Sequence, residues 1–174
     1  MGVQLILVVE ADSRGASDWI YIKETIEHFY AIDNAHIKLT PLYMEGRGNY
    51  KKIQSKIKDK EKRYSVTAKN NVSHVIYCFD CDQYDKRIED YNFLEEAKKY
   101  CKDNCYDFVW FCRDIEHVYL KKQIDSSEKS FKAEQFKNNN DINNITSRIL
   151  SSASYKLGTS NLMLILDKYL KHKE

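Results

Sequence analysis

Residues 74–85 read HVIYCFDCDQYD, and this stretch decides the fold class. The run from Val75 to Phe79 is continuously apolar, and it is followed by two acids, Asp80 and Asp82. Such a run is typical of a strand that is buried on both faces, as the strands of parallel sheets are. The stretch therefore predicts a central strand with two carboxylates at its carboxyl end.

Two more stretches follow the same pattern. Residues 4–10 read QLILVVE and end at Glu10, and residues 106–112 read YDFVWFC. Residues 36–44 alternate apolar and polar side chains, but Pro41 cannot donate a hydrogen bond to a neighbouring strand. We therefore expect an edge or irregular strand there, and about four strands in all.

Helical periodicity fills the segments between these strands. Apolar residues recur every three or four positions over residues 17–31, which start with the helix-favouring pair Ser17 and Asp18, and again over residues 93–101. Residues 51–63 predict a surface helix with few apolar anchors. Alternating strands and helices indicate βαβ units. We expect an α/β, three-layer fold with a central, mostly parallel sheet and helices on both faces.

The expected sheet and its helices occupy residues 1–124. Residues 125–144 are polar and predict a long loop around a short helix. Helical periodicity returns over residues 145–150 and 162–170, so two helices should close the chain. We expect residues 125–174 to form a C-terminal helical extension that packs on the same domain.

Composition excludes little. The 174 residues include 28 Lys and Arg against 26 Asp and Glu, so the formal charge of +2 does not by itself indicate a nucleic-acid partner. No stretch approaches the roughly 18 apolar residues of a membrane helix, and no basic segment precedes the first apolar run. We expect a cytoplasmic protein without a membrane segment, whose five cysteines are reduced thiols.

The acids that follow the strands form a candidate site. Carboxyl ends of parallel strands meet at one edge of the sheet, where α/β proteins bind ligands. We expect Glu10, Asp80 and Asp82 to converge there. Close carboxylates repel one another unless a cation neutralises them, and oxygen ligands favour Mg²⁺ or Mn²⁺ over zinc. As an alternative, each acid could cap a helix or a turn.

Cys78 and Cys81 have the C-x-x-C spacing of a zinc or redox site. Residues three apart along a strand point to opposite faces, and the other cysteines do not supply a second C-x-x-C pair. The spacing therefore favours packing roles for both thiols.

A family resemblance rests on two of these stretches. Leu7-Val8-Val9-Glu10 before a helix, and Ile76 to Asp82 with its D-x-D acids, resemble the glutamate and D-x-D motifs of the Toprim domain. The resemblance covers residues 4–112, with Gly46 or Gly48 as the turn glycine. It implies a Toprim-like fold in which Glu10, Asp80 and Asp82 hold one or two Mg²⁺ ions for phosphoryl transfer on nucleic acid.

Two departures narrow the resemblance. Ala11 follows Glu10 where the family usually has glycine, and no glycine and basic residues follow the D-x-D acids as they do in topoisomerases and the ribosomal-RNA maturase. These departures leave the small phage-defence proteins of the family as the nearest resemblance. Those proteins are RloB-like, abortive-infection or OLD-type.

Two later segments are similar to those of the RloB-like and abortive-infection proteins: residues 111–117, FCRDIEH, and residues 156–161, KLGTSN. The resemblance implies that Glu116 adds a metal ligand or positions water, and that Lys156 supplies positive charge as a lysine does in OLD-like nucleases. Alternatively, Glu116 is an acid favoured at a helix N-terminus and Lys156 is a solvated lysine. His117 is a weaker candidate, since an isolated histidine is more often packed or capping.

Basic residues concentrate between Arg47 and Arg63, with Tyr50 and Tyr64 among or beside them. Such a surface can follow a phosphate backbone, and tyrosines can stack on bases. A solvated helix face without a ligand is an equally good interpretation. The candidates for nucleic-acid contacts are Arg47, Lys51, Lys52 and Lys56.

The function expected from these observations is metal-dependent hydrolysis of phosphodiester bonds in RNA or DNA, in the manner of a Toprim nuclease in phage defence. One alternative is primase-like nucleotidyl transfer. Another is a non-catalytic Toprim-like binding or regulatory subunit that acts with a partner ATPase, because the sequence has no G-x-x-x-x-G-K-[ST] loop of its own.

Overall fold

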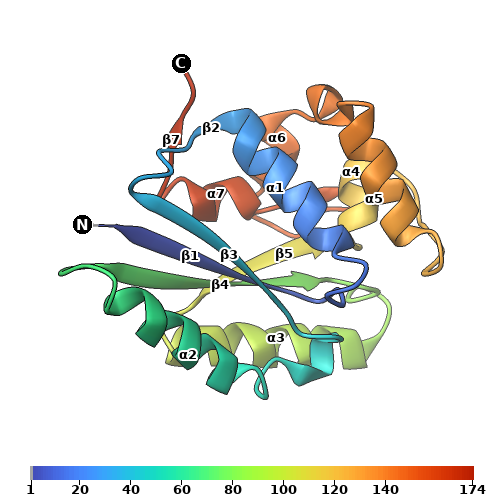
Figure 1. The fold of residues 1–174 in the computed structure, drawn as a ribbon. Coiled ribbons are helices and arrows are strands. Elements are labelled where there is room, and N and C mark those ends of the chain that lie inside the picture. Colours follow the sequence, from blue (N-terminus) through green and yellow to red (C-terminus); the bar gives the residue numbers. More distant parts are fainter. Residues whose placement is uncertain (1) are drawn as a thin grey trace.

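The central sheet has five strands. A computed structural model describes residues 2–174 and has an α/β fold, with the strand order β3-β1-β4-β5-β6 (Figure 1). The first four strands are parallel, and β6 pairs antiparallel to β5. The strands are β1 (Val3–Val9), β3 (Ile37–Tyr43), β4 (Val72–Asp80), β5 (Asp107–Cys112) and β6 (Thr159–Ser160). The predicted mostly parallel sheet is confirmed, and β6 is an addition to it.

Helices cover both faces of this sheet, so the three-layer prediction is also confirmed (Figure 1). The helices on one face are α1 (Ser17–Phe29), α4 (Ile115–Leu120), α5 (Lys129–Asn138), α6 (Ser147–Leu150) and α7 (Leu162–Leu166). Those on the other face are α2 (Gln54–Ser65) and α3 (Ile88–Asp103). Short 3₁₀ helices, η1 (Arg47–Asn49) and η2 (Asp141–Asn144), lie in the connections. No helix among residues 2–174 is long and apolar enough to cross a membrane.

Each central strand contributes to two hydrophobic cores. On β1, Leu5 and Leu7 pack on the side of α1, whereas Ile6 and Val8 pack on the side of α2 and α3. Side chains alternate across a strand, so a strand covered on both faces must be apolar at every position. This requirement explains the continuous apolar runs in the sequence.

The C-x-x-C cysteines lie in different cores. Cys78 packs on the side of α1, and Cys81 packs on the side of α2 and α3. The prediction that these thiols point to opposite faces is confirmed, and both are buried free thiols.

Strand β3 is an edge strand, as predicted. Val3 N donates to His36 O at 2.7 Å, and Met44 N donates to Val9 O at 2.8 Å. Because backbone groups alternate in direction along a strand, the even-numbered residues face β1 and Pro41 faces away from it. The hydrogen bond that Pro41 cannot donate would therefore have pointed out of the sheet.

Several element boundaries differ from the predictions. The first helix ends at Phe29 because Tyr30–Ala31 form strand β2, which pairs with β7 (Lys171–His172). The predicted surface helix over 51–63 begins later, at Gln54, and exposes its basic face as expected.

The C-terminal extension is not entirely helical. Strand β6 joins the main sheet and β7 pairs with β2, while α6 and α7 are shorter than the predicted helices. Strands of two residues have no periodicity that a sequence pattern could reveal. Helix α5 occupies ten residues of the predicted polar loop, because Ala133 and Phe136 bury one side of it.

Candidate functional site

Two of the predicted acids meet at the carboxyl edge of the sheet. Glu10 follows β1 and Asp80 ends the neighbouring strand β4. The Glu10 Oε1 atom accepts a hydrogen bond from the backbone N of Asp80 at 2.9 Å. The two carboxylates are therefore neighbours because of the parallel register of their strands.

Asp80 also fixes the start of α4. Its Oδ1 accepts a hydrogen bond from Ile115 N at 2.9 Å. The next residue is Glu116, which is fully buried, and its Oε2 accepts from Lys129 Nζ at 2.9 Å. Its Oε1 has no hydrogen-bond partner within residues 2–174. A buried carboxylate oxygen without a partner is costly and points to an additional proton, water or cation.

Asp18 completes the group, which we call the acidic cluster: Glu10, Asp18, Asp80 and Glu116. Asp18 lies at the start of α1 and is nearly buried, and its Oδ2 accepts from Ala11 N at 2.9 Å. The sequence pattern indicates only a helix-starting role for Asp18. The signal that could have identified it is its position in the first turn of the helix that leaves the same sheet edge as Glu10.

Electrostatics within the acidic cluster favours protonation or a bound cation. Burial raises the pKa of Glu10 to about 8, and Asp18 and Asp82 add to this effect against the hydrogen bond from Asp80. Burial also raises the pKa of Asp80 well above its usual range, helped by Glu10, Asp18 and Glu116. The pKa values of Asp18 and Glu116 are raised chiefly by burial as well. Each group resists ionisation chiefly because it is buried, and like charges add to this effect for Glu10, Asp80 and Glu116.

The third predicted acid, Asp82, pairs with an arginine. Its backbone is left-handed, with φ of 48°, and its N donates to Arg113 O at 2.7 Å. Its Oδ2 accepts from Arg47 at 2.5 Å, and the same guanidinium donates to the buried Asp90 at 2.7 Å. Asp82 is near enough to Glu10 to raise the pKa of that group. Arg47 is therefore a structural partner of the D-x-D loop before any contact with nucleic acid.

The donor chemistry fits a hard divalent cation. Glu10, Asp80 and Asp82 offer carboxylate oxygens on one sheet edge, and these are the ligands that Mg²⁺ and Mn²⁺ prefer. In the arrangement described for residues 2–174, no three acidic, histidine or cysteine side chains already surround a common point as metal ligands do. The ion pair with Arg47 uses Oδ2 of Asp82, and Oδ1 is the second carboxylate oxygen of that group.

The lysine that pairs with an acid of the cluster is Lys129, which is not among the residues predicted from the sequence. Lys156 is exposed and makes no ion pair in the described part of the chain, although its carbonyl closes the turn to Thr159. Lys129, from the polar stretch, reaches Glu116 instead. Partial burial lowers the pKa of Lys129, but the negative charges of Glu116 and Asp80 raise it by more, so the net shift of the pKa is upward. No local sequence pattern distinguishes Lys129 from other exposed lysines.

The remaining basic candidates lie beside this edge. Lys51, Lys52 and Lys56 are exposed at the start of α2. Lys52 and Lys56 line a hollow of about 210 Å³ that also includes Glu45, after the carboxyl end of β3. Glu45 also lines a neighbouring hollow of about 570 Å³ that contains Glu10. The hollow with Lys52 and Lys56 is basic, whereas the hollow with Glu10 is acidic, because Asp12 and Glu45 outnumber Arg14 in its lining.

Gly46 is the turn residue that lines the hollow with Glu10. Its N donates to Glu10 O at 3.0 Å, and its φ of 108° favours glycine. Of the two glycines suggested by the sequence, Gly46 is the one that contacts Glu10.

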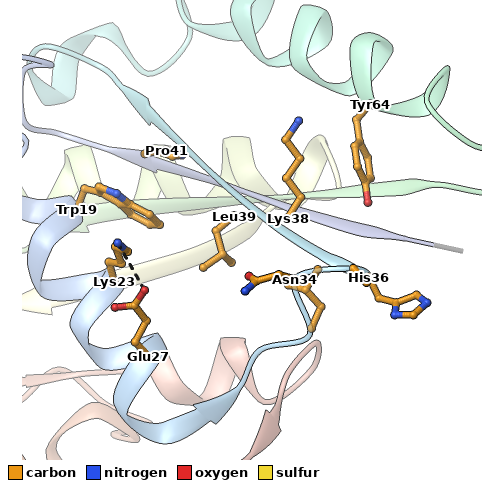
Figure 2. Close-up of a pocket in the computed structure, with 11 residues that line it drawn as sticks. Trp19, Lys23, Glu27, Asn34, His36, Lys38, Leu39, Pro41 and Tyr64 are labelled. Atoms are coloured by element: carbon orange, nitrogen blue, oxygen red, sulfur yellow. Dashed lines mark ion pairs between the residues drawn. The ribbon is translucent and has the colours of Figure 1, made fainter.

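Another hollow, of about 690 Å³, lies away from these acids. Figure 2 shows it along the open side of β3, where Trp19 and the Lys23–Glu27 ion pair of α1 face Leu39 and Pro41. It contains none of the predicted site residues.

Protein-family models, curated proteins and solved structures were each compared with this chain, and none matches it. Any functional conclusion therefore rests on the chemistry of these residues.

Proposed function

We propose that the protein hydrolyses phosphodiester bonds of nucleic acid with the help of a divalent cation. The observation that carries this proposal is the acidic cluster at the carboxyl edge, where a buried oxygen of Glu116 has no hydrogen-bond partner among residues 2–174. Carboxylates are forced together there at a cost to stability, which is typical of sites that bind a cation for function.

The metal ligands would be Glu10, Asp80 and Asp82. When bound, Mg²⁺ or Mn²⁺ would lower the pKa of an attacking water and neutralise charge on the phosphate. Glu116 follows Ile115, whose backbone N binds Asp80, and its carboxylate would accept a hydrogen bond from that water and orient it. Lys129, held by Glu116, would place positive charge next to the reacting phosphate.

Substrate approach would use the basic residues beside the acids. Lys52 and Lys56 would contact backbone phosphates on the side of β3. Arg47 would add a phosphate contact to its ion pairs with Asp82 and Asp90, because a guanidinium has five N–H donors. Phage defence remains the biological setting implied by the family resemblance.

Cleavage assays test the proposal. Labelled single-stranded and duplex RNA and DNA are incubated with Mg²⁺, Mn²⁺ or a chelator. We expect metal-dependent cutting that is lost in Glu10→Gln and Asp80→Asn. Asp59→Asn is the matched control, because Asp59 is an exposed acid on α2 that pairs only with Arg63.

The outcomes separate the alternatives. Cutting that survives in both site variants would overturn the site. Extension of a strand by added nucleotides would identify nucleotidyl transfer instead. Absence of both reactions, together with a co-purified ATPase, would identify the binding-subunit alternative.

A further inference from the structure

A further hollow, of about 540 Å³, lies beside β5 on the side of α3. We call it the aromatic groove. Phe108 and Trp110 of β5 and Tyr106, the residue just before this strand, occupy alternate positions and line the same side of the groove. The ring of Tyr155 packs on Trp110 with centroids 4.8 Å apart and an interplanar angle of 79°. The volume falls within the range of about 300–1,000 Å³ that is typical of ligand pockets.

The rings of the groove are held in place before any ligand arrives. Tyr106 accepts a hydrogen bond on its hydroxyl from Gln54 at 2.7 Å. Phe108 packs on the buried Phe79 with centroids 5.6 Å apart. Tyr106, Phe108 and Tyr155 nevertheless keep part of their surface exposed. Rigid, partly exposed rings are suited to stacking because little side-chain freedom is lost on binding.

The backbone of β5 is not available to an added peptide strand here. The Asn161 side chain accepts from Trp110 N at 2.9 Å and donates to Phe108 O at 3.0 Å. Recognition by strand addition needs such groups to be free. The groove must therefore recognise its ligand through its side chains.

The charges of the groove favour an anionic ligand. Lys168 pairs with Asp107 across it, whereas the exposed Lys98 on α3 makes no ion pair within residues 2–174. Aromatic faces next to a free ammonium match a planar base that carries a phosphate.

The groove also adjoins the D-x-D loop. Tyr84, two residues after Asp82, donates from its hydroxyl to Tyr155 O at 3.2 Å, and the two rings lie 5.1 Å apart. A strand that crosses this loop would arrive at the groove with its next nucleotides. We propose that the aromatic groove binds an unstacked nucleobase and its phosphate from a single-stranded nucleic acid, so that the enzyme selects single strands. This inference rests on the proposed function for the identity of the substrate.

Binding without cleavage tests the groove. Fluorescein-labelled single strands of uridine or thymidine nucleotides, and a labelled duplex, are titrated in chelator and followed by anisotropy. We expect the single strands to bind more tightly than the duplex. Tyr155→Ala should weaken this binding about five- to a hundredfold, as loss of one base stack does. Tyr155→Phe keeps the ring and should bind as the unmodified protein does.

A lysine pair supplies a control that cannot be explained by unfolding. Lys98→Ala should lower the salt dependence of binding by about one counterion. Lys99→Ala, the neighbouring exposed lysine outside the groove, should leave it unchanged. Equal affinities of Lys98→Ala and Lys99→Ala, equal affinities of Tyr155→Ala and Tyr155→Phe, or a duplex bound as tightly as a single strand would each overturn the inference.

The two proposals fail in different ways. A single strand that binds through Tyr155 but is never cut with Mg²⁺ or Mn²⁺ would leave the groove and overturn hydrolysis. Metal-dependent cutting, together with an affinity that Tyr155→Ala does not change, would support hydrolysis and overturn the groove. Uridine monophosphate that binds as tightly as the strand would assign the groove to a free nucleotide and overturn strand selection.

Discussion

Glu116 shows how one residue links stability to the site. Its side chain is 0% exposed and its ion-pair partner Lys129 is 31% exposed. Removal of one partner of a buried pair leaves the other charge without compensation, whereas removal of both can be nearly neutral.

We expect Lys129→Met to lower the free energy of unfolding by about 2–4 kcal/mol, somewhat less than for a fully buried pair because Lys129 is partly solvated. The double variant Lys129→Met with Glu116→Gln should recover more than half of that loss. Urea denaturation measures both, with Lys132→Met on the same helix as control. Equal losses in the single and double variants would show that Lys129 stabilises α5 and not Glu116.

Glu10 predicts how stability depends on pH. Its pKa is about 8 in the folded protein and about 4.5 in the unfolded chain, so the folded state binds the proton more tightly between these values. Its contribution is complete below 4.5 and is lost as the pH rises through about 8. In chelator, the free energy of unfolding should decrease over this window by on the order of 1–3 kcal/mol after allowance for solvent access. The melting temperature should fall with it.

Two comparisons isolate the effect of Glu10. Glu10→Gln should flatten the decline, and Mg²⁺ should raise the melting temperature of the unmodified protein more at pH 8 than at pH 6, because metal and proton compete for one carboxylate. A decline that is the same in Glu10→Gln, or a melting temperature indifferent to Mg²⁺, would contradict the cation site. Thermal unfolding followed by circular dichroism is sufficient.

Part of the site could be predicted from single residues. Glu10, Asp80 and Asp82 each interrupt or follow an apolar run, and a parallel sheet brings such positions to one edge. Lys129 could not be predicted, and Asp18 had only the weak signal of its place in the first turn of the helix after Glu10. Their roles depend on how α1 and α5 pack over that edge, and each is an ordinary helix-start or surface residue in the sequence.

At the scale of elements, Pro41 protects the open edge of β3. It removes one outward N–H from a strand that would otherwise offer a continuous row of donors. Pro41→Val should therefore increase self-association with little change in melting temperature, as measured by light scattering at rising concentration. Leu39→Val, which leaves the backbone donors unchanged, is the control. A monomeric Pro41→Val variant would show that the side chains around β3 already prevent pairing.

Elements were predictable in proportion to the apolar signal that they carry. Strands β1, β4 and β5 are buried on both faces and appear as apolar runs. Strands β2, β6 and β7 have two residues each, and they form because distant parts of the chain meet. A pattern along the sequence contains no information on such meetings.

The whole molecule depends on its last third. Leu150, Leu162 and Leu166 belong to the same core as α1 and β5. A fragment that ends at residue 124 would lose this apolar cover and expose the edge of β5. We expect it to aggregate and to lack a cooperative unfolding transition. A sigmoidal denaturation curve from that fragment would show that residues 2–124 form an independent domain.

Strand β6 and the Asn161 side chain together close the edge of β5, and both are synthesised well after β5. Residues 113–158 must be synthesised between β5 and its cover, which takes several seconds at about 5–20 residues per second. During that interval β5 pairs with β4 but its other edge stays open, so growth conditions that slow translation over this segment should lower the yield of folded protein.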